Sequence, residues 1–208
     1  MKNYLCSALI LLAMVSCDSK KEAVKTSYKT PDMKLASDVM TPEVLWSFGR
    51  IGSVSVSPDQ KTLLYDVTYF NKEEDRSYSD IYVMNLADGK SQQLTDTDYK
   101  EFGETWTSDG KIAFMSSKSG SVQLWEMNAD GSGLTQLTNV EGGIGGFIFS
   151  PDKSKLLFLK DVKLEQDVHD LHPDLPKANA RLIDGQVYRH WNDWVEVYTH
   201  PFVADYIP

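Results

Sequence analysis

Residues 80–89 read Asp-Ile-Tyr-Val-Met-Asn-Leu-Ala-Asp-Gly and lead into Gln-Leu-Thr at 93–95. The chain then repeats this phrase: residues 123–131 read Gln-Leu-Trp-Glu-Met-Asn-Ala-Asp-Gly and lead into Gln-Leu-Thr at 136–138. The two Leu-Thr endings lie 43 residues apart. A repeat of about 40–50 residues, built of short strands and Asp-Gly turns, is typical of the blades of a β-propeller. The repeat therefore predicts an all-β fold made of such blades.

Three polar motifs mark the start of successive units. They are Ser-Pro-Asp at 57–59, Thr-Ser-Asp-Gly at 107–110 and Ser-Pro-Asp at 150–152. The spacing is 50 residues and then 43, and a polar insertion at 71–79 is expected to account for the longer interval. Alternating and apolar runs predict strands at 54–57, 62–68, 81–85 and 91–94 in the first unit and at 112–116 and 122–128 in the second.

A short helix is predicted before the first strand. Thr41 is a good N-cap, Pro42 suits the first helical turn, and Glu43 favours the positive end of the helix dipole. Gly49 or Gly52 is expected to end this helix.

The third unit departs from the pattern. A strand is expected at 156–159, a long insertion at 161–183, and one more strand at 200–206. Each blade buries its faces against its neighbours, so three to four units leave two apolar faces open. The prediction is a partial β-propeller of three to four blades, each a four-stranded antiparallel sheet, that follows a signal peptide and a linker.

Composition limits the function classes. The 208-residue chain is 41% hydrophobic and 25% charged, as is ordinary for a globular protein. Its net charge is −9 at pH 7, and it has no stripe of Lys and Arg. Nucleic acid is therefore not an expected partner.

The first 16 residues are predicted to be a lipoprotein signal peptide. Lys2 supplies a positive end, and the apolar run at 5–15 is shorter than the roughly 20 residues that a membrane-spanning helix needs. Met-Val-Ser-Cys at 14–17 resembles the lipobox of bacterial lipoproteins, although Met14 stands where Leu is usual. The alternative is an ordinary signal peptide with a chance Cys.

A lipid anchor at Cys17 would place the protein in the cell envelope, in the periplasm or at the outer membrane. The membrane is then a partner through that lipid. The chain has two cysteines, and Cys6 lies in the segment expected to be removed, so no internal disulfide is expected. Residues 17–40 are polar and predicted to be a flexible linker, and 41–208 form the incomplete N-terminal propeller domain.

No motif for a cofactor or a metal is convincing, and none is predicted. The glycine run at 142–146 is interpreted as a turn between blades, and residues 128–133 as a hairpin rather than a calcium loop. His169 and His172 share one helical face, but no second ligand pair completes a site, which favours a solvated loop. No Gly-x-Ser-x-Gly nucleophile motif occurs in the 208 residues.

The densest aromatic cluster is the segment 188–194, Tyr-Arg-His-Trp-Asn-Asp-Trp. Arg189, Trp191 and Trp194 are candidates for a surface that faces a substrate. The alternative is that the tryptophans pack between blades with the arginine stacked on them.

These residues carry a family resemblance. The Ser-Pro-Asp starts and the Asp-Gly turns that lead to Leu-Thr resemble TolB-type propeller repeats. Thr-Pro-Glu-x-Leu-Trp at 41–46, Gly-Arg at 49–50, the segment 188–194 and His-x-Phe-Val at 200–203 resemble the N-terminal propeller of the prolyl oligopeptidase family. The acylaminoacyl peptidase and dipeptidyl peptidase 5 branch is the most similar.

The resemblance implies a propeller of about seven blades that caps an α/β-hydrolase domain with a Ser-Asp-His triad. That domain lies C-terminal to the propeller and is absent from these 208 residues, so no triad residue is assigned. Asp-Trp-Val-Glu at 193–196 resembles, with a single Glu, the motif that binds the substrate's amino terminus in the dipeptidyl peptidase IV branch. Glu196 is therefore a further substrate-facing candidate, whereas Glu73 and Glu74 are interpreted as surface charge.

Two functions are expected from the sequence. The first is the propeller part of an exported serine exopeptidase that cleaves short peptides; it is catalytically silent by itself and meets peptides only through the catalytic domain. The alternative is a TolB-like propeller that serves as a binding module of the cell envelope.

Overall fold

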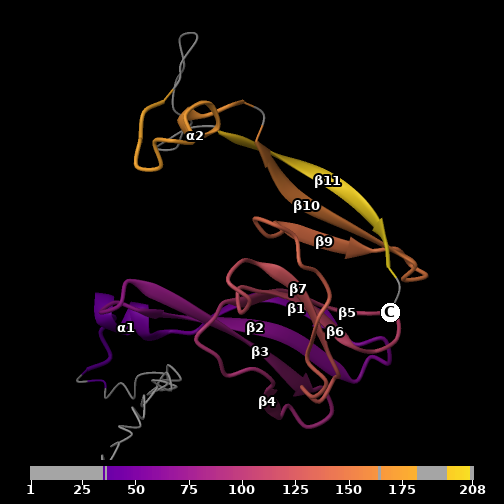
Figure 1. The fold of residues 1–208 in the computed structure, drawn as a ribbon. Coiled ribbons are helices and arrows are strands. Elements are labelled where there is room, and N and C mark those ends of the chain that lie inside the picture. Colours follow the sequence, from indigo (N-terminus) through magenta and orange to yellow (C-terminus); the bar gives the residue numbers. More distant parts are fainter. Residues whose placement is uncertain (1–34, 36, 164, 182–195, 207–208) are drawn as a thin grey trace, which may run out of the picture.

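The computed structural model describes residues 35, 37–163, 165–181 and 196–206. These residues form three antiparallel sheets that follow one another along the chain and stack side by side (Figure 1). No sheet closes on itself, so the predicted all-β partial propeller is confirmed with three blades. The predicted signal peptide, Cys17 and most of the predicted linker lie outside the described residues.

The first sheet is a four-stranded meander. It contains β1 (Arg50–Val56), β2 (Thr62–Asn71), β3 (Arg76–Asn85) and β4 (Ser91–Gln93), in that order. The predicted helix precedes it as α1 (Pro42–Ser47), and the Thr41 hydroxyl accepts a hydrogen bond from the Val44 amide. The helix ends at Ser47, before either predicted glycine, because Phe48 already has extended backbone angles.

The predicted polar insertion at 71–79 is mostly strand. Only the turn at 72–75 interrupts the ladder, in which Tyr69 pairs with Tyr78 and Phe70 with Ser77. The β2–β3 hairpin is thus longer than predicted because aromatic residues and continuous cross-strand pairing outweigh the local polarity.

The second sheet matches the predicted blade. It contains β5 (Glu101–Trp106), β6 (Ile112–Ser116), β7 (Gln123–Met127) and β8 (Thr135–Gln136). The segment 128–133 is the hairpin turn between β7 and β8, as predicted, with Gly131 at a φ of +85°. The glycine run at 142–146 joins the second sheet to the third, and only Gly146 is in a strand.

The third sheet has three described strands: β9 (Gly146–Phe149), β10 (Lys155–Lys163) and β11 (Val197–Asp205). β10 lies in the middle and pairs with both neighbours. β10 runs past Asp161, where the insertion was expected to begin, because it pairs with β11 along nine residues. The insertion contains α2 (Val168–Leu171), whose first turn Asp167 caps.

The three unit starts form the same turn. In each, the amide of the fourth residue donates to the carbonyl of the first, over 2.8–3.0 Å. That fourth residue has a φ of +60° at Gln60, +79° at Gly110 and +57° at Lys153. The turn geometry is therefore a property of the repeat, although only one of the three positions is a glycine.

Two apolar layers hold the sheets together. Leu64, Ile81, Ile112 and Phe114 form the centre of the layer between the first and second sheets. Ala113, Met115, Leu124, Ile144 and Leu156 form the layer between the second and third. Within the part of the chain that the structure describes, no helix is long and apolar enough to cross a membrane.

Candidate functional site: a cleft between the first two sheets

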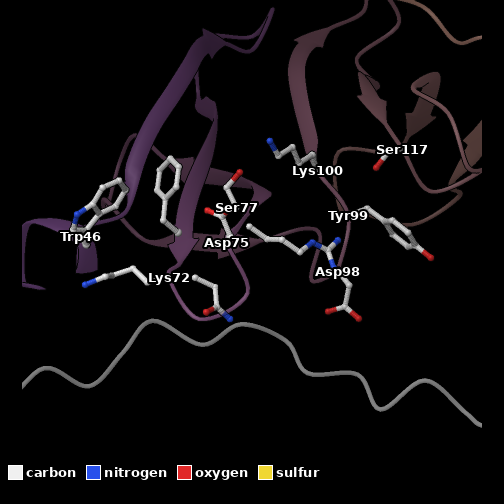
Figure 2. Close-up of a pocket in the computed structure, with 11 residues that line it drawn as sticks. Trp46, Lys72, Asp75, Ser77, Asp98, Tyr99, Lys100 and Ser117 are labelled. Carbon is white, nitrogen blue, oxygen red and sulfur yellow. The ribbon is translucent and has the colours of Figure 1, made fainter. Parts of the chain in front are cut away.

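A cleft of about 770 Å³ lies between the first two sheets (Figure 2). α1 and the tip of the β2–β3 hairpin form one wall, and the β4–β5 connection with the β6–β7 turn forms the other. The lining residues are Trp46, Phe70, Asn71, Lys72, Asp75, Arg76, Ser77, Asp98, Tyr99, Lys100 and Ser117. Four segments that are distant in sequence thus build one site.

An aromatic and cationic stack forms the first wall. The Arg50 guanidinium carbon lies 5.1 Å from the centre of the Trp46 ring and 4.4 Å from that of Phe70, and the two rings meet edge to face at 5.5 Å. A Cβ at Gly49 would lie 2.7 Å from the Tyr69 ring. A side chain at this position would therefore force the Tyr69 ring to move.

The hairpin tip is fixed by a side-chain cap. The Asn71 side-chain oxygen accepts hydrogen bonds from the backbone amides of Glu73 (3.0 Å) and Glu74 (3.3 Å). The Glu74 carboxylate in turn accepts from the Tyr78 hydroxyl, and this bond is the main cause that raises the pKa of Tyr78. Glu73 and Glu74 are exposed in the turn and do not line the cleft.

The cleft carries more positive than negative charge, although the chain as a whole is acidic. Lys72, Arg76 and Lys100 face two carboxylates, Asp75 and Asp98. Among the described residues, none of these five side chains takes part in an ion pair with another. Basic side chains beside aromatic rings suit a ligand that has a carboxylate and an apolar group.

Two carboxyl groups beside the β4–β5 connection, Asp80 on β3 and Glu101 at the start of β5, have raised pKa values. Burial is the largest cause that raises the pKa of Asp80 to about 6, with a smaller effect from the charge of Glu101. Burial also raises the pKa of Glu101, against a hydrogen bond from the Thr97 hydroxyl (3.1 Å) that lowers it. Neither Asp80 nor Glu101 is among the residues that line the cleft.

The structure describes one of the four site residues predicted from the sequence. The cleft lies at the end of the first two sheets where the second strand of each turns into the third. Arg189, Trp191 and Trp194 lie outside the described residues. Glu196 is described: it is exposed just before β11 and pairs with Arg181 across the insertion.

The cleft residues were not predicted as a site. Trp46 and Arg50 were noted only as helix and family-motif residues, and the basic side chains at 72, 76 and 100 had no shared pattern. Among the described residues, no group of three His, Cys, Asp or Glu side chains could hold a metal. His169 lies in α2 with its ring 3.8 Å from the Asp167 carboxylate.

Stacked antiparallel sheets with a repeated turn define the class of the protein, a β-propeller repeat protein. Its sequence is similar to two curated relatives. It is 44% identical over 167 residues, or 80% of the chain, to dipeptidyl-peptidase 5 of Porphyromonas gingivalis. It is 34% identical over 198 residues, or 94% of the chain, to dipeptidyl-peptidase 5 of Porphyromonas endodontalis. The matches cover 24% and 29% of those proteins, so the chain spans about a quarter of their length.

Solved structures agree on the fold. The acylaminoacyl peptidase of Pyrococcus horikoshii superposes on 76% of this chain and 24% of its own, with a TM-score of 0.57 and 17% identity. No family model matches the chain. With these relatives, the chain corresponds to the N-terminal propeller region of a prolyl oligopeptidase-family peptidase. The comparisons do not favour the alternative of an envelope binding module.

Proposed function

We propose that this chain is the N-terminal part of the propeller of an exported, lipid-anchored serine peptidase that cleaves short peptides, and that it is catalytically silent by itself. The observation that carries the proposal is the 44% identity to a dipeptidyl-peptidase 5 across 80% of the chain. The peptidase chemistry belongs to an α/β-hydrolase domain, which would supply the nucleophile, base and orienting acid. The propeller's contribution is to admit and hold the peptide.

The cleft suits this role. Its basic side chains would attract the carboxylate end of a short peptide, and the ring of Trp46 would contact an apolar side chain. The predicted signal peptide and Cys17 would place the enzyme on the cell envelope, where peptides from outside reach it.

The gene tests the enzymatic part of the proposal. We expect the reading frame to continue past the codon for Pro208 into further blades and a Gly-x-Ser-x-Gly motif. The full gene product should then release a fluorophore from dipeptidyl substrates, and Ser→Ala at that motif should abolish the release. A stop codon followed by unrelated sequence, or a product that hydrolyses no dipeptidyl substrate, would contradict the proposal.

The cleft's role is tested separately in the same enzyme. Lys100→Ala should raise KM about 3- to 10-fold with little change in kcat, since it removes one charge-assisted contact worth about 1 kcal/mol. Lys90→Ala is the matched control, because Lys90 is exposed on the β3–β4 turn outside the cleft. Equal KM values for the two variants would exclude the cleft from substrate binding.

The anchor is tested by fractionation. Cys17→Ser should move the protein from the membrane fraction to the soluble fraction of the envelope. Unchanged membrane association would contradict lipidation at Cys17.

A further inference from the structure

Two buried carboxyl groups face each other between the first and second sheets. Asp66 lies on β2 and is 5% exposed, and Glu104 lies on β5 and is 3% exposed. They belong to neither the cleft lining nor the apolar layer, and they come from different blades. Side chains of this kind are rarely buried unless they are neutralised.

Ser53 of β1 connects the pair. Its backbone amide donates to Asp66 Oδ1 over 2.8 Å, and its hydroxyl oxygen lies 2.8 Å from Glu104 Oε1 and 3.2 Å from Asp66 Oδ1. A hydroxyl has a single hydrogen to donate, so Ser53 cannot satisfy both carboxylates in full. Gly52 makes room for the group, because a Cβ there would lie 2.3 Å from Asp66 Oδ1.

No cation balances the pair. Among the described residues, no Lys, Arg or His forms an ion pair with Asp66 or Glu104, and Glu104 Oε2 is buried without a hydrogen-bond partner. The charged neighbour that acts on Glu104 is Asp66. The charge of Glu101 acts on Asp80 of β3, and the charge of Lys118 acts on Glu101. Two buried carboxylates of like charge, one with an oxygen that lacks a hydrogen-bond partner, raise the free energy of the folded state. Binding one proton to the pair removes the repulsion between them.

The acidity of Glu104 agrees with this geometry. Burial is the largest cause that raises the pKa of Glu104 to about 7, and the neighbouring charge of Asp66 raises it further. Hydrogen bonds from its own backbone and from Ser53 act in the opposite direction. A protonated Glu104 can donate to Asp66, which no ionised form can do.

The pair is connected to the cleft along three strands. Asp66 lies four residues from Phe70 on β2, Glu104 lies four residues from Lys100 at the start of β5, and Ser53 lies three residues from Arg50 on β1. At about 3.3 Å a residue, the distance along each strand is about 10–13 Å. Phe70 and Lys100 line opposite walls, so the pair joins the two walls below the cleft.

We propose that Asp66 and Glu104 share one proton and act as a proton-dependent clamp between β2 and β5, which holds the walls of the cleft together and loosens as the pH rises above neutrality. This inference needs no catalytic domain and is independent of the proposed peptidase activity. The sign follows from linkage. Glu104 binds its proton more tightly in the folded than in the unfolded chain, so its stabilising effect is complete below about pH 4.5 and is lost as the pH rises through about 7.

The test is the pH dependence of unfolding of the full gene product, measured by urea titration at pH 5, 6, 7 and 8. Between pH 5 and 8 the folding equilibrium constant of the wild type should fall about 70-fold more than that of Glu104→Gln, which resembles the protonated side chain. Asp66→Asn should flatten the profile in part, because it removes the charge of Asp66 but leaves the burial that raises the pKa of Glu104, and it covers the case that Glu104→Gln fails to fold. Glu141→Gln, an exposed carboxyl to amide change, is the control and should follow the wild type. The pKa of Asp80 is also raised, so Asp80 contributes a pH dependence of stability of the same sign. Asp80 is unchanged in every variant, so its contribution cancels when the variants are compared.

A distance measurement tests the link to the cleft. Spin labels are attached to Lys72→Cys and Lys100→Cys in a chain whose Cys6 and Cys17 are replaced by Ser. The distance distribution between the two labels should be broader or longer at pH 8 than at pH 5. In Glu104→Gln the two distributions should coincide. Equal pH slopes of unfolding in wild type and Glu104→Gln, or a label distance unaffected by pH in the wild type, would overturn the clamp. So would calcium that stabilises the wild type but not Glu104→Gln at pH 8, because the pair would then hold a cation and not a proton.

Discussion

The second and third sheets differ in burial far more than in hydrogen bonding. Every residue of β6 is buried, and four of the five in β7 are. Every residue of β11 is exposed, although it pairs with β10 along nine residues. β6 with β7 and β10 with β11 are both regular antiparallel hairpins, so strand pairing does not explain the difference in burial. The difference is that the second sheet has a sheet on each side and the third has one on a single side among the described residues.

The comparison teaches that a blade obtains its stability from its neighbours. β11 presents Phe202 and Val203 to solvent, and β9 presents Ile148, which is 68% exposed. The first sheet is similar on its far face, where Ile51 and Val54 are 65% and 57% exposed. Hydrophobic burial is proportional to the area removed from water, so the same residue types contribute much less in the outer sheets.

The largest expected effect is a difference in stability between a variant of the second sheet and a variant of the third. Phe114→Ala in β6 should lower the free energy of unfolding by about 3–5 kcal/mol, because Phe114 is 1% exposed and the change leaves a cavity between two sheets. Phe202→Ala in β11 should cost about 1 kcal/mol, since Phe202 is 39% exposed and mainly loses its stacking on Phe158. Urea unfolding of both variants measures the difference. Equal losses would show that burial by neighbours is not what distinguishes the sheets.

A smaller effect is expected at the ion pairs. Lys153 joins the third sheet to the second through Asp109 (2.7 Å) and Glu126 (2.6 Å), and the Lys153 and Glu126 side chains are 11% and 7% exposed. Lys153→Met should lower the free energy of unfolding by about 1–2 kcal/mol, because Glu126 stays buried and keeps, among the described residues, Lys111 as its one remaining ion-pair partner.

The matched control lies within the third sheet. Lys155 and Asp205 form an exposed pair, and Asp205→Asn should change the free energy of unfolding by less than about 0.5 kcal/mol.

The loss of stability at low pH is a second way to measure the contribution of the Lys153 ion pairs. Burial acts to raise the pKa of Asp109, but hydrogen bonds from Lys153 and Thr107 outweigh it and hold the pKa at about 2. The stabilisation from Asp109 is therefore present above about pH 3.8 and lost as the pH falls through about 2. Lys153→Met should weaken this acid dependence.

The smallest effect concerns the repeated turn. Gly110→Ala in the second unit should cost about 1 kcal/mol, because its φ of +79° strains any residue with a Cβ. Gln60→Gly in the first unit should be neutral or stabilise by up to about 1 kcal/mol, since it removes that strain at a φ of +60°. Thermal unfolding of the two variants is the measurement. A shift of the same sign in both would contradict the equivalence of the turns.

Much of the blade could be predicted from the sequence. The strand at 112–116 was predicted with the bounds that the structure shows, and so was the turn between β7 and β8. The β2–β3 hairpin was predicted too short. Its tip reads as a polar loop, and the pairing of Tyr69 with Tyr78 becomes apparent only when the two strands are aligned.

The cleft could not be predicted in this way. Its residues come from one helix and three connections, and only the packing of the first sheet against the second brings Trp46 and Lys100 to the same cavity. The same packing buries Glu101 and Glu104, which read as ordinary surface charges in the sequence.

Local sequence determines the repeat, the turns and the strand periodicity. A turn hydrogen bond or an alternation of side chains depends only on near neighbours in the chain. The similarity of the chain to peptidase propellers can also be recognised from these short stretches. Which polar groups become buried between blades, and which of them then need a proton, depends on how one sheet lies against the next. The interaction of Asp66 with Glu104 exists only once β2 and β5 are packed together, since the low polarity of that contact gives the two carboxyl groups their effect on each other.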